Sequence, residues 1–310
     1  MITPRHFLTL LDRTPEELGL LINTAIKLKE ERNKGIKHRE LEGKTLAMIF
    51  EKSSTRTRIS FETGMNELGG HPMFLSNRDI QLGRGETIKD TARVLSRYVH
   101  GIVIRTYGHE RVEELAEYSS VPVINALTDS FHPCQIMADM MVMQEKFGKI
   151  KGLKVAYIGD GNNMAHSWIN AASQMGFHIT VASPKKYSCN SSIVEKAIPI
   201  ANKNGGTITL TESPQEAVEN AHVVYTDVWA SMGQEEESMQ RIKDFQGYQV
   251  DSNLMSLALK DAVFMHCLPA HRGEEVTEEV LESSSSVIFD EAENRLHVQK
   301  AILIDCIGGI

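Results

Sequence analysis

The sequence has 310 residues, of which 33 are Lys or Arg and 41 are Asp or Glu, so its formal net charge is −8. This length predicts two domains, because single hydrophobic cores stop growing at about 250–300 residues. With 41% hydrophobic and 24% charged residues, the composition excludes a disordered or collagen-like chain. The acidic balance also argues against nucleic acid or an anionic membrane as a partner.

The four cysteines are widely spaced and form no CxxC pair. The sequence therefore predicts neither a disulfide framework nor a structural zinc site. No run approaches the roughly 18 apolar residues that would span a bilayer, and the first residues lack a signal-peptide pattern. We expect a cytoplasmic protein with no membrane partner.

The predicted elements begin with a helix that starts at Thr14-Pro15-Glu16-Glu17 and ends near Gly35, since a cap, a proline and a glutamate stand at helix-start spacing. Short β-rich runs then alternate with helical patterns. The expected strands are Leu46–Phe50, Ile102–Arg105, Val121–Asn125, Lys154–Ile158, Ile179–Ala182, Thr207–Leu210, Val223–Thr226, Ala262–His266 and Val287–Asp290. The expected helices include Ser60–Leu68, Thr87–Arg97, Cys134–Phe147, Met164–Met175, Ser191–Asn202 and Glu291–Ile307.

This alternation predicts an α/β fold with two domains, each a mainly parallel sheet flanked by helices. The best internal boundary is the polar segment Lys146–Gly152. We therefore expect one domain at residues 1–148 and a second at 149–290, with the C-terminal helix 291–310 packing back on the first.

A polar cluster follows the first expected strand at its carboxyl end, where parallel α/β sheets bind ligands. The cluster consists of Ser54, Thr55, Arg56 and Thr57 at the start of a helix. Hydroxyl groups, backbone N–H groups and a guanidinium at a helix N-terminus suit a phosphate. We favour this interpretation over a simple helix cap with solvated arginines.

Other cations and hydrogen-bond donors follow further strands. Arg105 ends the second expected strand, His132 and Gln135 follow the third, and Arg295 lies in the last helix. Each of these residues alone is explained as well by surface charge or packing. Together they predict a crevice that binds an anion and stabilises developing negative charge.

The segment Gly159-Asp160-Gly161 invites a dinucleotide interpretation. The third glycine of that fingerprint is replaced by Met164, and the acidic residue expected about 20 positions later is missing, because the next strand ends in Ser183. Both failures argue against NAD. Asn162 and Asn163 instead offer amides that could hold the carboxylate and amine of an amino acid.

Two later strand ends also bear polar groups. Asp227 could hold an ammonium group or simply form a turn. Cys267 has His266 beside it and His271 nearby, which suggests a nucleophilic thiol or a zinc ligand. The sequence provides neither a fourth metal ligand nor a Cys-His-Asn order, so we expect no metal.

Taken together, four motifs in this order resemble those of the aspartate/ornithine carbamoyltransferase superfamily, and of its ornithine branch in particular. They are Ser54-Thr55-Arg56-Thr57-Arg58, His132-Pro133-Cys134-Gln135, Asp227 with Ser231-Met232-Gly233, and His266-Cys267-Leu268-Pro269. The first two are shared with aspartate carbamoyltransferases, and the last two are ornithine-type features. The resemblance implies two α/β domains with the active site in the cleft between them, a homotrimer or a multiple of trimers, and no metal or organic cofactor.

The resemblance also implies the residue roles. The carbamoyl phosphate site would consist of Ser54, Thr55, Arg56, Thr57, Gln81, Arg105, His132, Gln135, Leu268 and Arg295. Gln81 would reach the site of a neighbouring subunit. The ornithine site would consist of Asn163, Asp227, Ser231, Met232 and Cys267. The catalytic residues would be Arg105, His132, Asp227 and Cys267, and either Asp227 or Cys267 would assist deprotonation of the ornithine amine.

The implied reaction transfers the carbamoyl group of carbamoyl phosphate to the δ-amino group of L-ornithine, giving L-citrulline and phosphate. It would serve arginine biosynthesis or degradation. One alternative is a sister transferase for putrescine or an acetylated ornithine. An NAD-dependent dehydrogenase is disfavoured by the broken glycine fingerprint, and a non-catalytic binding protein by the complete set of motifs. The segment Ser231–Gln240 is expected to move when the domains close.

Overall fold

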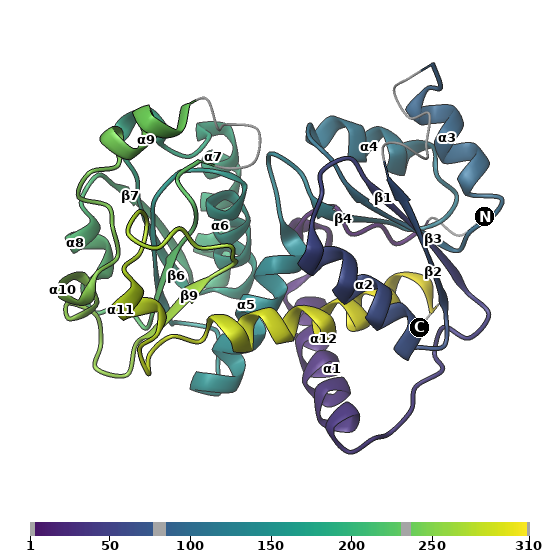
Figure 1. Cartoon of the computed structure of the whole chain (residues 1–310), viewed down its shortest axis with the longest axis horizontal. Helices are drawn as coiled ribbons and strands as arrows, with labels where there is room; N and C mark the ends of the chain where they lie inside the picture. The colour runs from purple at the N-terminus through teal and green to yellow at the C-terminus, as the bar shows by residue number, and fades with distance from the viewer. Residues whose placement is uncertain (1–3, 77–84, 231–236, 309–310) are drawn as a thin grey trace. The chain divides into compact units, whose positions relative to one another are not determined.

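The computed structural model describes residues 4–76, 85–230 and 237–308. The chain divides into two compact units: unit 1 consists of Met1–Met141 and Glu293–Ile310, and unit 2 of Val142–Ala292. The chain passes from unit 1 to unit 2 within helix α5 (Pro133–Phe147) and returns within helix α12 (Ile288–Ile307) (Figure 1). No helix in the described ranges has both the length and the apolar character needed to cross a membrane.

Unit 1 is built on a parallel sheet whose described strands have the order β2-β1-β3-β4. The strands are β1 (Thr45–Phe50), β2 (His71–Ser76), β3 (Gly101–Arg105) and β4 (Val123–Leu127). Helices α3 (Ile88–Leu95) and α4 (His109–Tyr118) cover one face, while α1 (Pro15–Asn33), α2 (Thr55–Glu67) and the unit 1 part of α12 cover the other (Figure 1). Because both faces are covered, the central strands β1 and β3 are almost wholly buried and apolar.

Local side-chain caps fix where the helices of unit 1 begin. As predicted, α1 starts with a capping box, in which Thr14 accepts a hydrogen bond from the backbone of Glu17 and Glu17 accepts one from the backbone of Thr14. Helix α2 begins five residues earlier than predicted, because Ser54 accepts a hydrogen bond from the N–H of Thr57. This cap places the first turn of α2 directly after β1.

Unit 2 has a parallel sheet with the strand order β7-β6-β5-β8-β9. The strands are β5 (Lys154–Ile158), β6 (His178–Ala182), β7 (Thr207–Thr211), β8 (Val223–Thr226) and β9 (Val263–His266). The helices are α6 (Asn163–Met175) and α7 (Ser191–Asn204) on one face, α8 (Pro214–Val218), α10 (Ser252–Met255) and α11 (Glu278–Leu281) on the other, and α9 (Ser238–Asp244) (Figure 1). Trp168 of α6 packs edge-on against Tyr225 of β8, with ring centroids 5.3 Å apart, and so joins helix to sheet.

The predicted strands differ from the structure mainly in three places, and one of them is β4, which begins and ends two residues later than the predicted Val121–Asn125. The predicted strand Val287–Asp290 is wrong: Ser286 forms a single bridge with Phe264 of β9, and α12 begins at Ile288. Apolar residues at the start of a buried helix thus imitate a short strand. Strand β2 was not predicted, because it is a half-exposed edge strand that contains Pro72, a residue that weakens a strand pattern.

Candidate active site

The strand order creates one topological switch point in each sheet. In unit 1 the chain leaves β1 for β2 on one side and reaches β3 on the other, so the switch point lies between the ends of β1 and β3. In unit 2 the corresponding place lies between β5 and β8. Ligands of open α/β sheets bind at such points. Ser54–Thr57 follow β1 and Arg105 ends β3, while Asn163 follows β5 and Asp227 follows β8. The other predicted site residues in the described ranges follow the neighbouring strands β4 and β9 or lie in α12.

The unit 1 site is a chain of buried hydrogen bonds around Thr57. Arg295 of α12 donates from Nη2 to Thr57 Oγ1 at 2.5 Å and from Nη1 to Gln135 Oε1 at 3.0 Å. Ser54 Oγ donates to Thr57 Oγ1 at 3.0 Å, and Gln135 Nε2 donates to Asp139 Oδ1 at 2.8 Å. The structure therefore brings together residues from α2, α5 and α12 that are far apart in sequence.

Three guanidinium groups surround a buried imidazole in this site. His132 is 4% exposed, and Arg105 and Arg295 are also buried. Burial lowers the pKa of His132 well below its ordinary value, and the positive charges of Arg295, Arg105 and Arg56 lower it further. His132 is therefore a neutral imidazole at neutral pH, with one ring N–H to donate. The site presents positive charge through its arginines and a neutral donor through its histidine.

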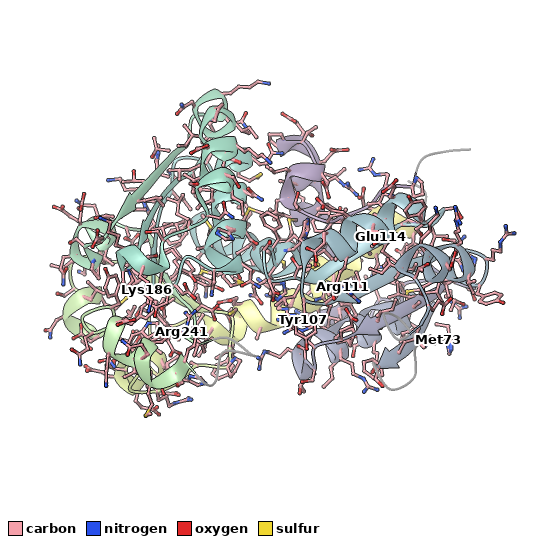
Figure 2. All side chains as sticks on the ribbon, turned by 90° about the horizontal axis from the view of Figure 1, so that it is seen from above. Met73, Tyr107, Arg111, Glu114, Lys186 and Arg241 are labelled. Carbon is pink, nitrogen blue, oxygen red and sulfur yellow. The ribbon has the colours of Figure 1, made fainter. Side chains whose placement is uncertain are left out.

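Two further arginines hold the loops that follow β1 and β5. Arg111 of α4 pairs with Glu51, just after β1, through Nη2 and Oε1 at 2.8 Å. Arg241 of α9 pairs with Asp160, just after β5, through Nη1 and Oδ2 at 2.8 Å. Arg111 and Arg241 are labelled in Figure 2. Burial raises the pKa of Asp160 to about 6 in spite of the nearby Arg241 charge. These ion pairs support the strand-end loops, and the sequence pattern did not reveal them.

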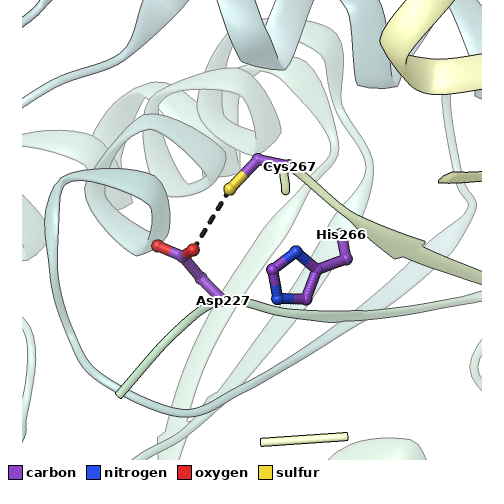
Figure 3. Close-up of side chains that lie close together, drawn as sticks. All are labelled: Asp227, His266 and Cys267. Carbon is purple, nitrogen blue, oxygen red and sulfur yellow. Dashed lines mark hydrogen bonds between the residues drawn. The ribbon is translucent and has the colours of Figure 1, made fainter. Parts of the chain in front are cut away.

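The unit 2 site is organised around the carboxylate of Asp227, which is 7% exposed. Asn162 Nδ2 donates to Asp227 Oδ2 at 2.9 Å, and the thiol of Cys267 donates to Asp227 Oδ1 at 3.1 Å (Figure 3). Asn162 is itself fixed, because its Oδ1 accepts hydrogen bonds from Tyr157 Oη and from the first N–H groups of α6. Both oxygens of Asp227 are thus oriented by side chains from other elements.

Asp227, His266 and Cys267 lie close enough together to suggest a metal site (Figure 3). The hydrogen bonds of His266 argue against this. Its Nδ1 accepts a hydrogen bond from the backbone N–H of Leu268 at 2.9 Å, and its Nε2 lies 3.1 Å from Glu275 Oε1. An imidazole that accepts at Nδ1 carries its proton at Nε2, so neither nitrogen has a lone pair left for an ion.

Most of the predicted site residues lie in the described part of the chain, at or near the carboxyl ends of the two sheets or bonded to residues there. Gln81, Ser231 and Met232, and with them most of the Ser231–Gln240 segment, lie outside the described residues. Asn163 begins α6 next to Asn162, and it is Asn162 that caps the helix and holds Asp227. The sequence offered both amides, and the N-cap preference for asparagine directly before the helix could have identified this role.

Gly161 of the apparent dinucleotide fingerprint is required by the packing of the chain itself. A Cβ added at Gly161 would lie 2.3 Å from the backbone nitrogen of Cys189. The N–H of Gly161 also donates to the carbonyl of Tyr187 at 2.8 Å. Glycine is thus required at position 161 by a neighbouring loop.

Comparison with known proteins adds independent findings. Residues 5–145 match the family model described as "Aspartate/ornithine carbamoyltransferase, carbamoyl-P binding domain". Residues 151–306 match "Aspartate/ornithine carbamoyltransferase, Asp/Orn binding domain". The two models together cover nearly the whole chain.

Whole proteins that are similar to this chain are named ornithine carbamoyltransferase. An ornithine carbamoyltransferase of Wolinella succinogenes is 60% identical over 300 residues, which are 97% of each chain. One from Anoxybacillus flavithermus is 56% identical over 303 residues, which cover 98% of this chain and 96% of that protein.

Among solved structures, the ornithine carbamoyltransferase from Pyrococcus furiosus is 52% identical, with a TM-score of 0.96 and all of both chains covered. The anabolic ornithine carbamoyltransferase from Campylobacter jejuni is 47% identical, with a TM-score of 0.93 and 97% and 98% of the two chains covered. These matches confirm the predicted α/β fold class and the resemblance seen in the motifs. The chain belongs to the aspartate/ornithine carbamoyltransferase family, as a carbamoyltransferase of the ornithine type.

Proposed function

We propose that this chain transfers the carbamoyl group of carbamoyl phosphate to the δ-amino group of L-ornithine, giving L-citrulline and phosphate. The observation that best supports this proposal is the pair of contrasting sites. The β1–β3 switch of unit 1 gathers guanidinium groups around a neutral imidazole, as an anionic substrate requires. The β5–β8 switch of unit 2 presents an oriented carboxylate, as a cationic substrate requires.

In this proposal the phosphate of carbamoyl phosphate is held at the first turn of α2 by Ser54, Thr55, Arg56 and Thr57, with Arg295 behind them. Backbone N–H groups at a helix start and a guanidinium are the groups that bind phosphate in proteins. The buried bond from Arg295 to Thr57 supports the assignment, because it holds the Thr57 hydroxyl at the start of α2. Phosphate then leaves with its charge already neutralised.

Arg105, His132 and Gln135 address the carbamoyl group. Attack by an amine turns the carbonyl oxygen into an oxyanion, which hydrogen-bond donors at that position stabilise. The lowered pKa of His132 supports a role as a neutral hydrogen-bond donor, with Arg105 supplying the positive charge. Leu268 offers its backbone carbonyl to the carbamoyl NH₂ group.

L-Ornithine binds at unit 2 through Asn163, Asp227, Ser231, Met232 and Cys267. Its δ-amine resembles that of lysine, with a pKa of about 10.4, so only about one molecule in 10³ is nucleophilic at neutral pH. The proton must be lost before the nitrogen attacks the carbamoyl carbon and the bond from that carbon to the phosphate oxygen breaks. Either Asp227 or Cys267, whose side chains are hydrogen-bonded at 3.1 Å, would accept that proton.

The proposal also assigns one substrate to each domain and an oligomeric state to the protein. Residues 1–148, with the helix 291–310, would form the carbamoyl phosphate domain, and residues 149–290 the ornithine domain. The descriptions of the two family models support this assignment. We also propose a cytoplasmic homotrimer or a multiple of trimers, in which Gln81 reaches a neighbouring subunit's site. The reaction would need neither a metal nor an organic cofactor.

The decisive experiment is a comparison of carbamoyl acceptors. Product formation from carbamoyl phosphate would be measured with L-ornithine, putrescine, N-acetylornithine and aspartate under the same conditions. We expect citrulline to form from L-ornithine and the other three acceptors to react far more slowly. If any of these three acceptors has a higher kcat/KM than L-ornithine, that acceptor and not L-ornithine is the substrate.

A matched pair of α2 variants tests the phosphate site. Arg56→Ala should lower kcat/KM for carbamoyl phosphate by at least about 10²-fold, as loss of one charged donor does. Arg58→Ala is the control, because Arg58 is exposed and stacks on Phe74, with its Cζ 3.6 Å from the ring centroid. Equal losses in the two variants would refute the assignment of Arg56.

A further inference from the structure

The strand end that bears Cys267 and Leu268 rests on a buried glutamate with no assigned role. Glu275 and His266 are both 0% exposed. Glu275 Oε1 lies 3.1 Å from His266 Nε2 and also accepts the backbone N–H of His271 at 2.6 Å. One carboxylate oxygen therefore contacts both ends of the segment that contains the His-Cys-Leu-Pro motif.

His266 transmits this contact to the backbone of Leu268. Its Nδ1 accepts the Leu268 N–H at 2.9 Å. This bond requires the tautomer with the proton on Nε2, and that proton is the one that Glu275 accepts. The backbone N–H of His266 donates to Glu291 Oε2 at 3.0 Å, so the histidine is held at its ring and at its main chain.

Leu268 needs such support, because its φ angle is +58°. A left-handed backbone is unfavourable for a residue with a Cβ. The conformation therefore depends on contacts that define it, and the Leu268 N–H bond to His266 is one of them. The same conformation sets the direction of the Leu268 carbonyl.

We propose that Glu275 is a positioning residue for the transfer reaction. It fixes the tautomer and orientation of His266, and His266 in turn fixes the Leu268 backbone that faces the carbamoyl NH₂ group. This inference rests on the proposed function, since it assigns a purpose to Leu268 in that reaction. Glu275 itself does not touch the substrates.

The first test compares two variants in which His266 is replaced by an amide side chain, a shorter one in His266→Asn and a longer one in His266→Gln. In His266→Asn the side-chain oxygen stands where Nδ1 stood and, because an amide oxygen has no tautomer to fix, it can accept the Leu268 N–H without Glu275. In His266→Gln the amide reaches Glu275 instead and the Leu268 N–H loses its acceptor. We expect His266→Asn to keep kcat within a few-fold of the wild type. We expect His266→Gln to lose about 10–100-fold in kcat, as sub-ångström to 1 Å misplacement of reacting groups does.

The second test addresses Glu275 directly. Glu275→Gln keeps an oxygen that can accept from His266 Nε2 and the His271 N–H, and should retain activity within a few-fold. Glu275→Leu removes the acceptor and should lower kcat to the level of His266→Gln. Binding of inorganic phosphate, measured by calorimetry on each variant, should be unchanged, because its proposed site lies on unit 1.

The outcomes separate this inference from the proposed function. If the wild type forms no citrulline, the proposed function fails. If the wild type is active but the two His266 variants lose activity equally, or Glu275→Leu keeps full kcat, the positioning role is refuted. Where Glu275→Leu neither unfolds cooperatively nor binds phosphate, Glu275→Asp takes its place. Its shorter side chain withdraws the carboxylate from His266 Nε2 and should lower kcat, and full kcat in that variant refutes the positioning role.

Discussion

His297 of α12 should make the protein less stable as the pH falls, and His297→Leu should remove that effect. The side chain is 0% exposed, and neither ring nitrogen has a hydrogen-bond partner in the described ranges. Burial, with the charges of Lys300, Lys29 and Arg32, lowers the pKa of His297 from 6.5 to about 4. The imidazole is therefore held neutral in the folded protein.

The sign and size follow from proton linkage. Between pH 6.5 and pH 4 the unfolded chain binds a proton at this histidine and the folded protein does not, so the folded state loses stability as the pH falls. The loss from this one group is about 2 kcal/mol between pH 7.5 and pH 5, and about 3 kcal/mol by pH 4. At pH 7.5 His297→Leu should be at least as stable as the wild type, because the buried ring forms no hydrogen bond.

Urea unfolding at pH 7.5 and pH 5, at one protein concentration, measures this difference. The gap between His297→Leu and the wild type should widen by about 2 kcal/mol at the lower pH. Gln299→Leu is the matched control, because Gln299 is equally buried, likewise lacks a hydrogen-bond partner among the described residues, and does not titrate. Its stability difference from the wild type should be the same at both pH values. A constant gap for His297→Leu would refute the argument.

Two further predictions concern the backbone and the thiols. Gly161→Ala should lower the melting temperature, because its Cβ would meet the Cys189 nitrogen at 2.3 Å. In the control Gly19→Ala, in α1, the added Cβ meets nothing within 4 Å and should raise the melting temperature slightly through helix propensity. An unchanged melting temperature for Gly161→Ala would contradict the close approach. In the native protein at pH 8, iodoacetamide should label Cys267 well before the buried thiols of Cys134, Cys189 and Cys306, whose pKa values burial raises to about 12. Mass spectrometry of a time course checks the order, and equal labelling of any buried thiol would count against it.

Much of the fold was predictable because buried parallel strands are short, continuous apolar runs. β1 and β5 lie where that pattern places them, and the capping box marks the start of α1. The strand order was not predictable, because hydrophobic periodicity does not state which strands are neighbours. The switch points, and with them the reason that the Ser54 and Asp227 segments matter, depend on that order.

The residue types of the site were predictable, while the contacts that orient them were not. Arg295 was a candidate cation, but its bond to Thr57 joins residues 238 positions apart and depends on the return of α12 to unit 1. Glu275 had no signal in the sequence beyond a charge near a histidine. The positioning role of Glu275 is inferred from its complete burial and its hydrogen bond with His266, which only the structure shows.

Net charge is a poor guide to the unit 1 site, since the chain as a whole carries −8 and the site concentrates cations. The arrangement depends on His132 remaining uncharged. An imidazolium beside three guanidinium groups would be a fourth positive charge in a buried place. Burial and the three positive charges therefore lower the pKa of His132. Removing Arg295 would relieve part of this repulsion and raise the pKa of His132, while it also removes the hydrogen bonds that Arg295 donates to Thr57 and Gln135. The same guanidinium therefore has two effects, since it provides charge for an anion and keeps the neighbouring imidazole neutral. For this reason the arginines and the histidine of this site act as one unit.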